Sequence, residues 1–333
     1  MCDLKEELVL YLTSLFLKYK LNMPFFTVII PTFNREKYIS KAIESVLVQT
    51  ISDFELIIID DASTDGTEAI VNTFTDSRIR YFKNEMNLER CLSRNRGIEK
   101  SKGKYICFLD SDDYHLPNHL EELKNEILLK NEPKAFFFTN AWNESALGER
   151  SERFCPDFEF INPFTYFLRY TVNPQRWAVH KEVFLRHLFD PEVTICEDMD
   201  TSLRMVAANV PVFQIKKRTT VYVAAEGSFT VSDSNKSEKE LFYLKKIFSK
   251  PELKNRLSKV EKGRLLSMCF FHLANKAISQ NRKIDFYIFA SKSFVLYPKG
   301  YNGKTNKILF ANYIYNLPLF GYLVRNLIKL SKK

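Results

Sequence analysis

Residues 27–60 read TVIIPTFNREKYISKAIESVLVQTISDFELIIID. The segments 27–32 and 54–60 are continuous apolar runs rich in β-branched residues, and they predict two buried strands. Between them, residues 36–49 place apolar side chains at the spacing of an amphipathic helix. A strand, a helix and a second strand in this order predict a parallel α/β sheet with helices on both faces.

The same alternation continues along the chain. Further helices are expected at 67–74, 88–100, from about Asp198, and over 235–298; further strands are expected at 79–84, 104–110, 135–139 and within 210–224. The predicted fold class is therefore α/β, a mostly parallel sheet flanked by helices, with a helical C-terminal extension.

The chain has 333 residues, of which 45% are hydrophobic and 27% charged, so wholesale disorder is excluded. Residues 1–233 carry 28 basic and 35 acidic side chains, a net charge of −7, whereas residues 234–333 carry 21 and 5, a net charge of +16. A nucleic-acid-binding protein would be coated more evenly with basic residues. No nucleic-acid partner is expected.

The six cysteines form no CxxC pair, which favours a reducing compartment. No stretch of about 18–20 apolar residues is present, so no membrane-spanning helix is expected. The first residues lack the order of a signal peptide, because Asp3, Glu6 and Glu7 come before any apolar block. We therefore expect a cytoplasmic protein.

Polar residues follow three of the predicted strands, at 31–35 (PTFNR), 60–65 (DDASTD) and 110–113 (DSDD). Ligands of open α/β sheets bind at the carboxyl ends of the strands. Capping of a helix would explain Ser63 or Asp65 but not the remaining acids, which repel one another unless a cation or hydrogen-bond donors offset their charge. Hard ions such as Mg²⁺ or Mn²⁺ prefer oxygen ligands and keep phosphate oxygens in their shell, so a metal–diphosphate site is expected here.

Two common classes of nucleotide-binding protein are disfavoured, because neither a GxGxxG after the first strand nor a GxxxxGK[ST] loop is present. Instead, residues 27–50, 54–67 (FELIIIDDASTDGT) and 94–113 (RNRGIEKSKGKYICFLDSDD) resemble the donor half of the family 2 glycosyltransferases, which have the GT-A fold. A fourth segment, 196–204 (CEDMDTSLR), is similar to the ED…LR segment of the acceptor half in that family. The resemblance covers about residues 25–225 and implies an inverting enzyme of the bacterial surface-glycan type.

The resemblance also implies roles for individual residues. The nucleotide-sugar would be bound by residues at the strand ends and on the helix predicted at 88–100: Pro31, Thr32, Asn34, Arg35, Asp60, Asp61, Arg94, Asn95, Asp110 and Ser111. The motif does not decide whether Asp60 or Asp61 faces the nucleoside. Asp112, together with Asp110, would bind Mn²⁺ or Mg²⁺, and Asp198, with Glu197 beside it, would be the catalytic base.

Several segments allow a second interpretation. The alternative for Glu197 and Asp198 is a structural role at the N-terminus of a helix, where acidic side chains are favourable. Arg176 and Trp177 are candidate acceptor-site residues, with packing as the alternative. His115 and His119 are four residues apart, but Pro117 lies between them, so a surface helix start is expected rather than a metal site. The segment 223–228 (VAAEGS) lacks a His that many family members carry, so Glu226, another group or none takes its place.

The expected domains are an N-terminal helical extension (1–23), a GT-A domain (24–232, with a donor half over about 24–115 and an acceptor half over about 116–232) and a basic helical region (233–333). Aromatic and aliphatic clusters with flanking cations in 304–333 suit an anionic membrane surface, and packing on the core is the alternative. The location expected is the cytoplasm, with peripheral binding to the inner face of the membrane.

The function expected is transfer of a sugar from a nucleotide-diphospho-sugar, a UDP-sugar, to a hydroxyl of a glycan or lipid-linked acceptor in surface polysaccharide synthesis. This would be a metal-dependent hexosyltransferase of class EC 2.4. The alternatives are a nucleotidyltransferase of similar topology and a non-catalytic descendant that binds a sugar or a protein partner.

Overall fold

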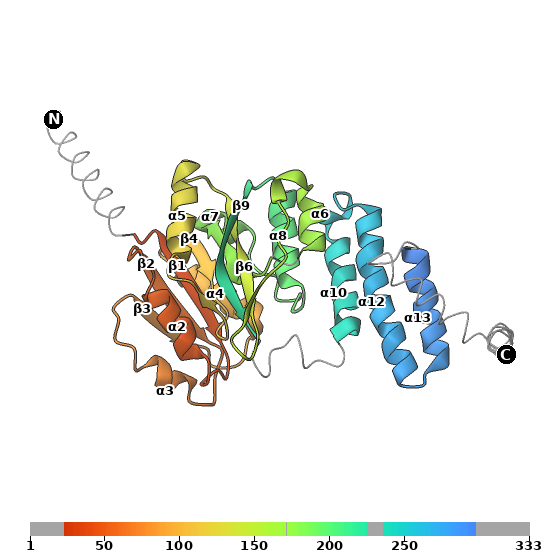
Figure 1. The fold of residues 1–333 in the computed structure, drawn as a ribbon, viewed down its shortest axis with the longest axis horizontal. Coiled ribbons are helices and arrows are strands. Elements are labelled where there is room, and N and C mark those ends of the chain that lie inside the picture. The colour runs from red at the N-terminus through yellow and green to blue at the C-terminus, as the bar shows by residue number, and fades with distance from the viewer. Residues whose placement is uncertain (1–22, 171, 225–235, 298–333) are drawn as a thin grey trace, which may run out of the picture. The chain divides into compact units, whose positions relative to one another are not determined.

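The computed structural model describes residues 23–170, 172–224 and 236–297, coloured in Figure 1. These residues form two compact units. The first contains the described residues up to Pro163 and from Tyr170 to residue 224, and the second contains Phe164–Arg169 and the helices after residue 235. The helical extension expected at 1–23, apart from Met23, the segment around Glu226 and the tail 304–333 lie outside the described residues.

The first half of the first unit alternates strands and helices as predicted. Its elements are β1 (Phe26–Thr32), α2 (Ile39–Leu47), β2 (Phe54–Asp60), α3 (Thr67–Val71), β3 (Ile79–Lys83), α4 (Glu89–Lys100) and β4 (Tyr105–Phe108). The four strands pair in parallel, in the order β3-β2-β1-β4. The helices α2 and α3 are shorter than their predicted ranges.

The second half completes the sheet. Its elements are β5 (Tyr114–His115), α5 (His119–Leu129), β6 (Phe136–Glu144), β7 (Arg150–Glu152), η1 (Phe158–Phe160), η2 (Pro174–Arg176), β8 (Trp177–His180), α7 (Lys181–Arg186), α8 (Glu197–Ala207) and β9 (Val212–Val223). The helix α6 (Pro163–Arg169) comes between η1 and η2 in the chain, and its residues from Phe164 onward belong to the second unit. Beyond β4 the order continues β8-β6-β9-β5, with β7 paired to β6; β8 is antiparallel to both of its neighbours. The predicted fold class, a mostly parallel sheet with flanking helices, is confirmed.

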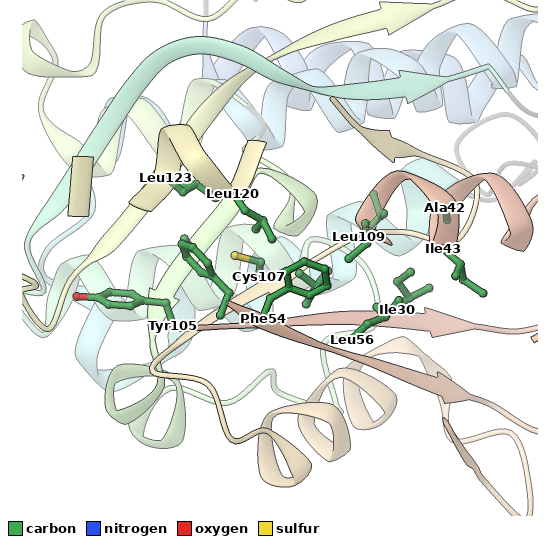
Figure 2. Packing of buried hydrophobic residues seen from close by; sticks show 14 of the residues in the cluster. Ile30, Ala42, Ile43, Phe54, Leu56, Tyr105, Cys107, Leu109, Leu120 and Leu123 are labelled. Carbon is green, nitrogen blue, oxygen red and sulfur yellow. The ribbon is translucent and has the colours of Figure 1, made fainter. Parts of the chain in front are cut away.

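The strands are apolar throughout because both faces of the sheet are covered. On one face, Figure 2 shows Ile30 of β1 and Leu56 of β2 packed beside Ala42 and Ile43 of α2. On the other face α4 lies directly on β1: a Cβ atom on Gly97 would come within 2.5 Å of the Ile29 side chain. Gly97 therefore allows the close approach of this helix to the sheet.

The connections of the sheet place three strand ends at one edge. From β1 the chain moves outward to β2 and β3, and then returns to β4 on the opposite side of β1. Thr32 is paired with Asp60, and Leu109 N–H donates to the carbonyl of Ile29 at 3.0 Å, so Asp110 leaves the sheet beside the end of β1. Ligands of α/β proteins bind at such a switch in strand order.

The second unit is helical, as expected for 235–298 within the described range. It contains α6 and the helices α10 (Lys236–Ser249), α11 (Pro251–Lys254), α12 (Lys259–Ser279) and α13 (Lys283–Leu296). The helices α12 and α13 pack through Ala274, Ala277, Phe286 and Ala290. Over the part of the chain that the structure describes, every helix is too short or too polar to cross a bilayer.

Candidate active site

The loops that follow β1 and β2 are joined by hydrogen bonds. Asn34 N–H donates to Ser63 Oγ (2.9 Å), and Asn34 Oδ1 accepts from Thr64 N–H (2.9 Å). Arg35 N–H donates to Thr67 Oγ1 (2.8 Å). Asn34 thus builds the edge of the sheet with both its main chain and its side chain. Within the described residues, the Arg35 guanidinium donates only to the nearby carbonyls of Phe33 and Asn34.

The two acids at the end of β2 are bound differently. Asp60 is fully buried and accepts from Ser63 N–H (2.7 Å) on one oxygen and from the Tyr81 hydroxyl (2.6 Å) on the other. Asp61 accepts from Asn84 Nδ2 (2.7 Å) and Leu88 N–H (2.8 Å) on the same oxygen, Oδ1. Asp61 Oδ2 receives no hydrogen bond from the described residues, so the geometry favours Asp61 over Asp60 as a ligand-binding group.

The turn after β4 carries three carboxylates with unequal surroundings. Asp110 accepts from Arg94 Nη2 (3.0 Å) and Gln175 Nε2 (2.9 Å), and Asp113 accepts from Val223 N–H (2.8 Å) and Gln175 Nε2 (2.8 Å). No other residue of 23–170, 172–224 or 236–297 donates a hydrogen bond to Asp112. Burial and the negative charge of Asp110 raise the pKa of Asp112 above its ordinary value. Asp112 is therefore the carboxylate of this turn that needs an external cation or donor.

A buried arginine connects this turn to α8. The Arg94 side chain is only 3% exposed, and its Nη1 donates to Glu197 Oε1 (2.8 Å) while its Nη2 donates to Asp110. Burial lowers the pKa of Arg94, but the charges of Asp110 and Glu197 more than offset this effect, so its pKa is raised overall. Arg94 is thus a permanent cation shared by the two acidic segments.

Asp198 is the acid of α8 that remains unpaired among the described residues. Glu197 is bound to Arg94, and Asp200 is paired with Arg204 at 2.9 Å. Asp198 accepts only the neighbouring Met199 N–H (2.7 Å). Burial, followed by the negative charge of Glu197, raises the pKa of Asp198 to about 7. A carboxylate with this pKa can accept a proton near neutral pH, as a general base requires.

The donor set of the turn fits a hard divalent cation. Asp110 and Asp112 offer carboxylate oxygens, and the raised pKa of Asp112 shows that a positive charge would be favourable there. In the described ranges no group of three or more His, Cys, Asp or Glu side chains is placed to hold a metal alone. The chain would therefore supply one or two carboxylates, which is how Mg²⁺ is usually bound when phosphate oxygens complete its shell.

Several predicted residues lie at this edge without a clear contact. Thr32 is buried and its Oγ1 has no hydrogen-bond partner in the described part of the chain. Pro31 precedes it in β1, which ends at Thr32, and Ser111 is buried inside the acidic turn. These residues are in the predicted place, and their contacts to a nucleotide remain predictions.

Asn95 has a structural role in this geometry. Its Nδ2 donates to the carbonyl of Phe189 (2.8 Å), and its Oδ1 accepts from Phe189 N–H (2.9 Å). Both ends of the amide therefore bind one main-chain segment. Contact of this side chain with a nucleotide, which the resemblance implies, would require breaking these bonds.

The side chains of Arg176 and Trp177 are packed inside the protein, which was the alternative to a role in binding the acceptor. Trp177 is fully buried, donates to the carbonyl of Val172 (2.8 Å) and stacks on the ring of Phe189. Arg176 is 1% exposed and donates through Nε to the carbonyl of Thr139 (2.6 Å). Neither side chain is accessible to an acceptor sugar, so their assignment as acceptor-site residues is corrected here.

His115 and His119 were expected to mark the start of a helix on the surface, and the surface position is wrong. His119 does begin α5, but both imidazoles are buried and stack at 3.7 Å between ring centres. The Gln175 carbonyl lies 2.9 Å from His115 Nε2, and the Thr219 hydroxyl lies 2.7 Å from His119 Nδ1. Burial lowers the pKa of His115 to about 4 and that of His119 well below its ordinary value.

One residue of the site was missed from the sequence. Gln175 immediately precedes the two residues that were singled out, Arg176 and Trp177, and its amide contacts two carboxylates of the acidic turn. An uncharged amide in an NPQRW segment carries no pattern that would have identified it. Its position depends on the pairing of β8 with β4, which brings Ala178 opposite Cys107.

Comparisons with known proteins agree with this geometry. The model of Glycosyl transferase family 2 matches residues 27–182. A putative colanic acid biosynthesis glycosyl transferase, WcaA of Escherichia coli (strain K12), is 29% identical over 232 residues, which are 67% of this chain and 80% of the relative. The uncharacterized glycosyltransferase MJ1057 of Methanocaldococcus jannaschii is 30% identical over 195 residues, 56% of this chain and 67% of the relative.

A third relative carries a more detailed description. The UDP-Glc:alpha-D-GlcNAc-diphosphoundecaprenol beta-1,3-glucosyltransferase WfgD of Escherichia coli is 41% identical over 105 residues. The match covers 32% of this chain and 41% of WfgD. It therefore concerns less than half of that enzyme.

Solved structures share the fold at low sequence identity. S. aureus TarS 1–349 in complex with UDP-GlcNAc has a TM-score of 0.59 and 20% identity, over 89% of this chain and 86% of that one. The mannosyltransferase PcManGT of Pyrobaculum calidifontis, in complex with GDP-Man and Mn²⁺, has a TM-score of 0.54 and 17% identity, over 89% and 88%. The sheet order, the acidic strand ends and these similarities lead to one conclusion: the chain belongs to glycosyl transferase family 2 and is a glycosyltransferase.

Proposed function

We propose that this glycosyltransferase moves a sugar from a UDP-sugar to a hydroxyl of a lipid-linked or other glycan acceptor, with inversion at the anomeric carbon, in surface polysaccharide synthesis. One observation carries the proposal. Arg94 binds Asp110 and Glu197, and the carboxylate beside each of these, Asp112 and Asp198, has no ion pair in the described residues. The two available acids, Asp112 and Asp198, thus each lie beside an acid that Arg94 binds.

Asp198 supports an inverting reaction. A sugar hydroxyl ionises far above neutral pH, so its attack on the anomeric carbon is accelerated when a carboxylate accepts its proton as the new bond forms. The raised pKa of Asp198, about 7, makes it basic enough for this transfer while it is still ionised at neutral pH. The hydroxyl oxygen bonds to the anomeric carbon, the bond to the nucleotide breaks, and the diphosphate leaves with the electron pair. A single displacement of this kind inverts the anomeric centre.

The leaving diphosphate accumulates negative charge in this reaction. Asp112, with Asp110, would hold Mn²⁺ or Mg²⁺ at the acidic turn. When bound, such an ion acts as a Lewis acid on the phosphate oxygens. PcManGT, which shares the fold, is described in complex with Mn²⁺, and this supports the same class of ion here. Asp61, at the end of β2, is the residue we propose for contact with the nucleoside.

The relatives support the substrate class. WfgD is described as using UDP-Glc and an acceptor on diphosphoundecaprenol, and WcaA as acting in colanic acid biosynthesis. We extend this class to the present chain as a UDP-hexose donor and a surface-glycan acceptor. The proposed domains remain an extension (1–23), a catalytic domain (24–232) and a basic region (233–333).

A lipid-linked acceptor would place the enzyme at the inner face of the cell membrane, and we propose cytoplasmic, peripheral binding through 304–333. Flotation of the full chain and of a chain ending at residue 303 on liposomes containing anionic lipid checks this. Greater recovery of the full chain is expected. Equal recovery of both chains would remove the segment 304–333 from the proposal.

A donor panel tests the central proposal. Release of UDP, GDP or another nucleotide is measured from each nucleotide-sugar, with and without Mn²⁺, in the presence of lipid-linked acceptors. We expect Mn²⁺-dependent release of UDP, and a product whose anomeric configuration, assigned by NMR, is opposite to that of the donor. Failure to release nucleotide from any donor, with no change in melting temperature on adding UDP and Mn²⁺, would favour a non-catalytic binding protein. Retention of configuration would overturn the inverting assignment.

A further inference from the structure

The amide of Gln175 binds two of the three carboxylates in the acidic turn. Its Nε2 donates to Asp110 Oδ2 at 2.9 Å and to Asp113 Oδ2 at 2.8 Å. An amide nitrogen has two hydrogens, so both are used on this pair of acids. The third carboxylate, Asp112, receives no hydrogen bond from Gln175.

Together with two other donors, Gln175 satisfies both oxygens of each acid that it contacts. Arg94 donates to the second oxygen of Asp110, and Val223 N–H donates to the second oxygen of Asp113. The same four oxygens would otherwise repel one another and Asp112 in a partly buried turn. The contacts therefore leave Asp112 as the carboxylate available to a ligand.

Gln175 is itself rigidly placed. Gln175 is only 2% exposed and lies on η2, which begins with Pro174. Its main-chain carbonyl accepts from the Thr220 hydroxyl at 3.1 Å and lies 2.9 Å from Nε2 of the buried His115. A residue anchored in this way can fix the carboxylates that it contacts.

The uncharged amide of Gln175 suits a site that binds a cation. An amide orients carboxylates by donating hydrogen bonds, but it adds no positive charge. Lysine or arginine at this position would bind the same acids and neutralise them. The turn consequently keeps its negative charge, which a divalent cation requires.

We infer that Gln175 is a positioning residue of the donor site, which fixes Asp110 and Asp113 so that Asp112 faces the metal–diphosphate of the donor. The inference rests on the proposed metal-dependent use of a UDP-sugar and names a residue, outside the family's motifs, on which that site depends. Gln175 acts through the two acids and not by contact with the substrate.

The test compares Gln175→Met, which keeps the length of the side chain and removes both donors, with Gln49→Met. Gln49 is a matched control, because its buried amide donates to the carbonyls of Ser45 and Leu116 and contacts no acid. Binding of UDP is measured by calorimetry at several Mn²⁺ concentrations, and binding of Mn²⁺ alone by electron paramagnetic resonance. Gln175→Met should weaken Mn²⁺-dependent binding of UDP about tenfold, the scale of a lost hydrogen bond to a charged group.

Three controls separate the outcomes. Gln49→Met should lower the melting temperature but leave the Mn²⁺ dependence unchanged. Gln175→Asn, whose amide is one methylene too short to reach both acids, should show the same defect as Gln175→Met in a folded protein. In a double-mutant cycle, Gln175→Met and Asp113→Asn should be clearly non-additive for UDP binding, because they remove one shared contact. A purely structural glutamine would give additive effects.

The inference and the proposed function fail in different ways. If wild-type protein binds UDP in a Mn²⁺-dependent manner and Gln175→Met binds it equally well, the inference is overturned and the proposed function stands. If wild-type protein shows no Mn²⁺-dependent binding of UDP, the metal-dependent donor site is overturned, and the inference with it.

Discussion

Arg94 and Glu197 form a buried ion pair, with 2.8 Å between Nη1 and Oε1 and with both side chains less than 10% exposed. The pair joins a helix of the donor half, α4, to the first residue of α8, 103 positions later in the chain. Because Arg94 also donates to Asp110, removal of its charge would leave the buried Glu197 and the partly buried Asp110 without the cation that they share.

Arg94→Met should therefore be strongly destabilising. Loss of one partner from a buried pair costs about 3 kcal/mol or more in the free energy of unfolding, which urea denaturation measures. Lys134→Met is the control, since it breaks an ion pair with Glu182 between two exposed side chains and should leave stability nearly unchanged. Equal effects of the two substitutions would contradict the bridging role of Arg94.

Asp198→Asn should abolish transfer and keep donor binding. Loss of a general base lowers kcat by about 10²- to 10⁴-fold, whereas UDP affinity depends on other residues. The proton acceptor must be ionised, so wild-type kcat should rise with pH and level off above about 7, the raised pKa of Asp198. The pH–rate profile of wild type and the residual rate of Asp198→Asn, measured with the best donor of the panel, check this. Full turnover by Asp198→Asn would exclude it as the base.

Asp112→Asn and Asp113→Asn should differ in their effect on the stability of the fold. Asp112 accepts no hydrogen bond from another described residue, so its substitution should leave stability unchanged or higher and weaken Mn²⁺-dependent UDP binding about tenfold or more. Asp113 accepts from Val223 N–H and Gln175, so its substitution should lower the melting temperature. Calorimetric titration and thermal unfolding of both variants provide the measurements, and identical behaviour of the two would refute the distinction.

The stacked histidines predict a loss of stability in acid. Burial holds the pKa of His115 at about 4, below the ordinary 6.5 that applies in the unfolded chain. Between these values the unfolded state binds a proton that the folded state does not, so stability is fully present above pH 6.5 and falls as the pH drops toward 4. The burial of His119 acts in the same direction. His119→Phe should flatten this dependence in urea denaturation from pH 4 to 7; a slope equal to that of wild type would exclude His119 as one of its sources.

Ala62→Gly should stabilise the protein. Ala62 has a φ of +65°, in the left-handed region that costs an alanine about 1–2 kcal/mol, and glycine adopts it freely. After the entropy that glycine loses on folding is subtracted, a gain of about 1 kcal/mol or less is expected. Ala42→Gly, in the buried face of α2, should instead lower the free energy of unfolding. Destabilisation by both would show that the backbone at residue 62 is not strained.

The strands of the donor half could be predicted almost residue for residue. The segment 54–60 is β2, and 27–32 is β1 with one further residue. Strands buried on both faces are continuous apolar runs, which is a local property of the sequence. The single long strand β9 was predicted only as strands within 210–224, because the burial of its residues follows no regular pattern along its length.

The sequence did not identify which residue of the segment 175–177 faces the site. Arg176 and Trp177 were the candidate acceptor-site residues, yet both side chains are buried. Gln175, one position earlier, contacts the acidic turn instead. Successive side chains of a tight helical turn point in different directions, and only the placement of η2 beside β4 decides which of them faces the site.

The sequence by itself determined the strands, the order of the acidic segments and the family, because apolar runs and motif spacing are local properties. The tertiary structure decided which carboxylates are bound within the protein and which remain available. Asp110 and Asp113 are satisfied by donors that lie 16, 65 and 110 positions away for Arg94, Gln175 and Val223, respectively. A carboxylate's availability depends on hydrogen bonds from such distant residues, and these exist only once the sheet has brought the strands together.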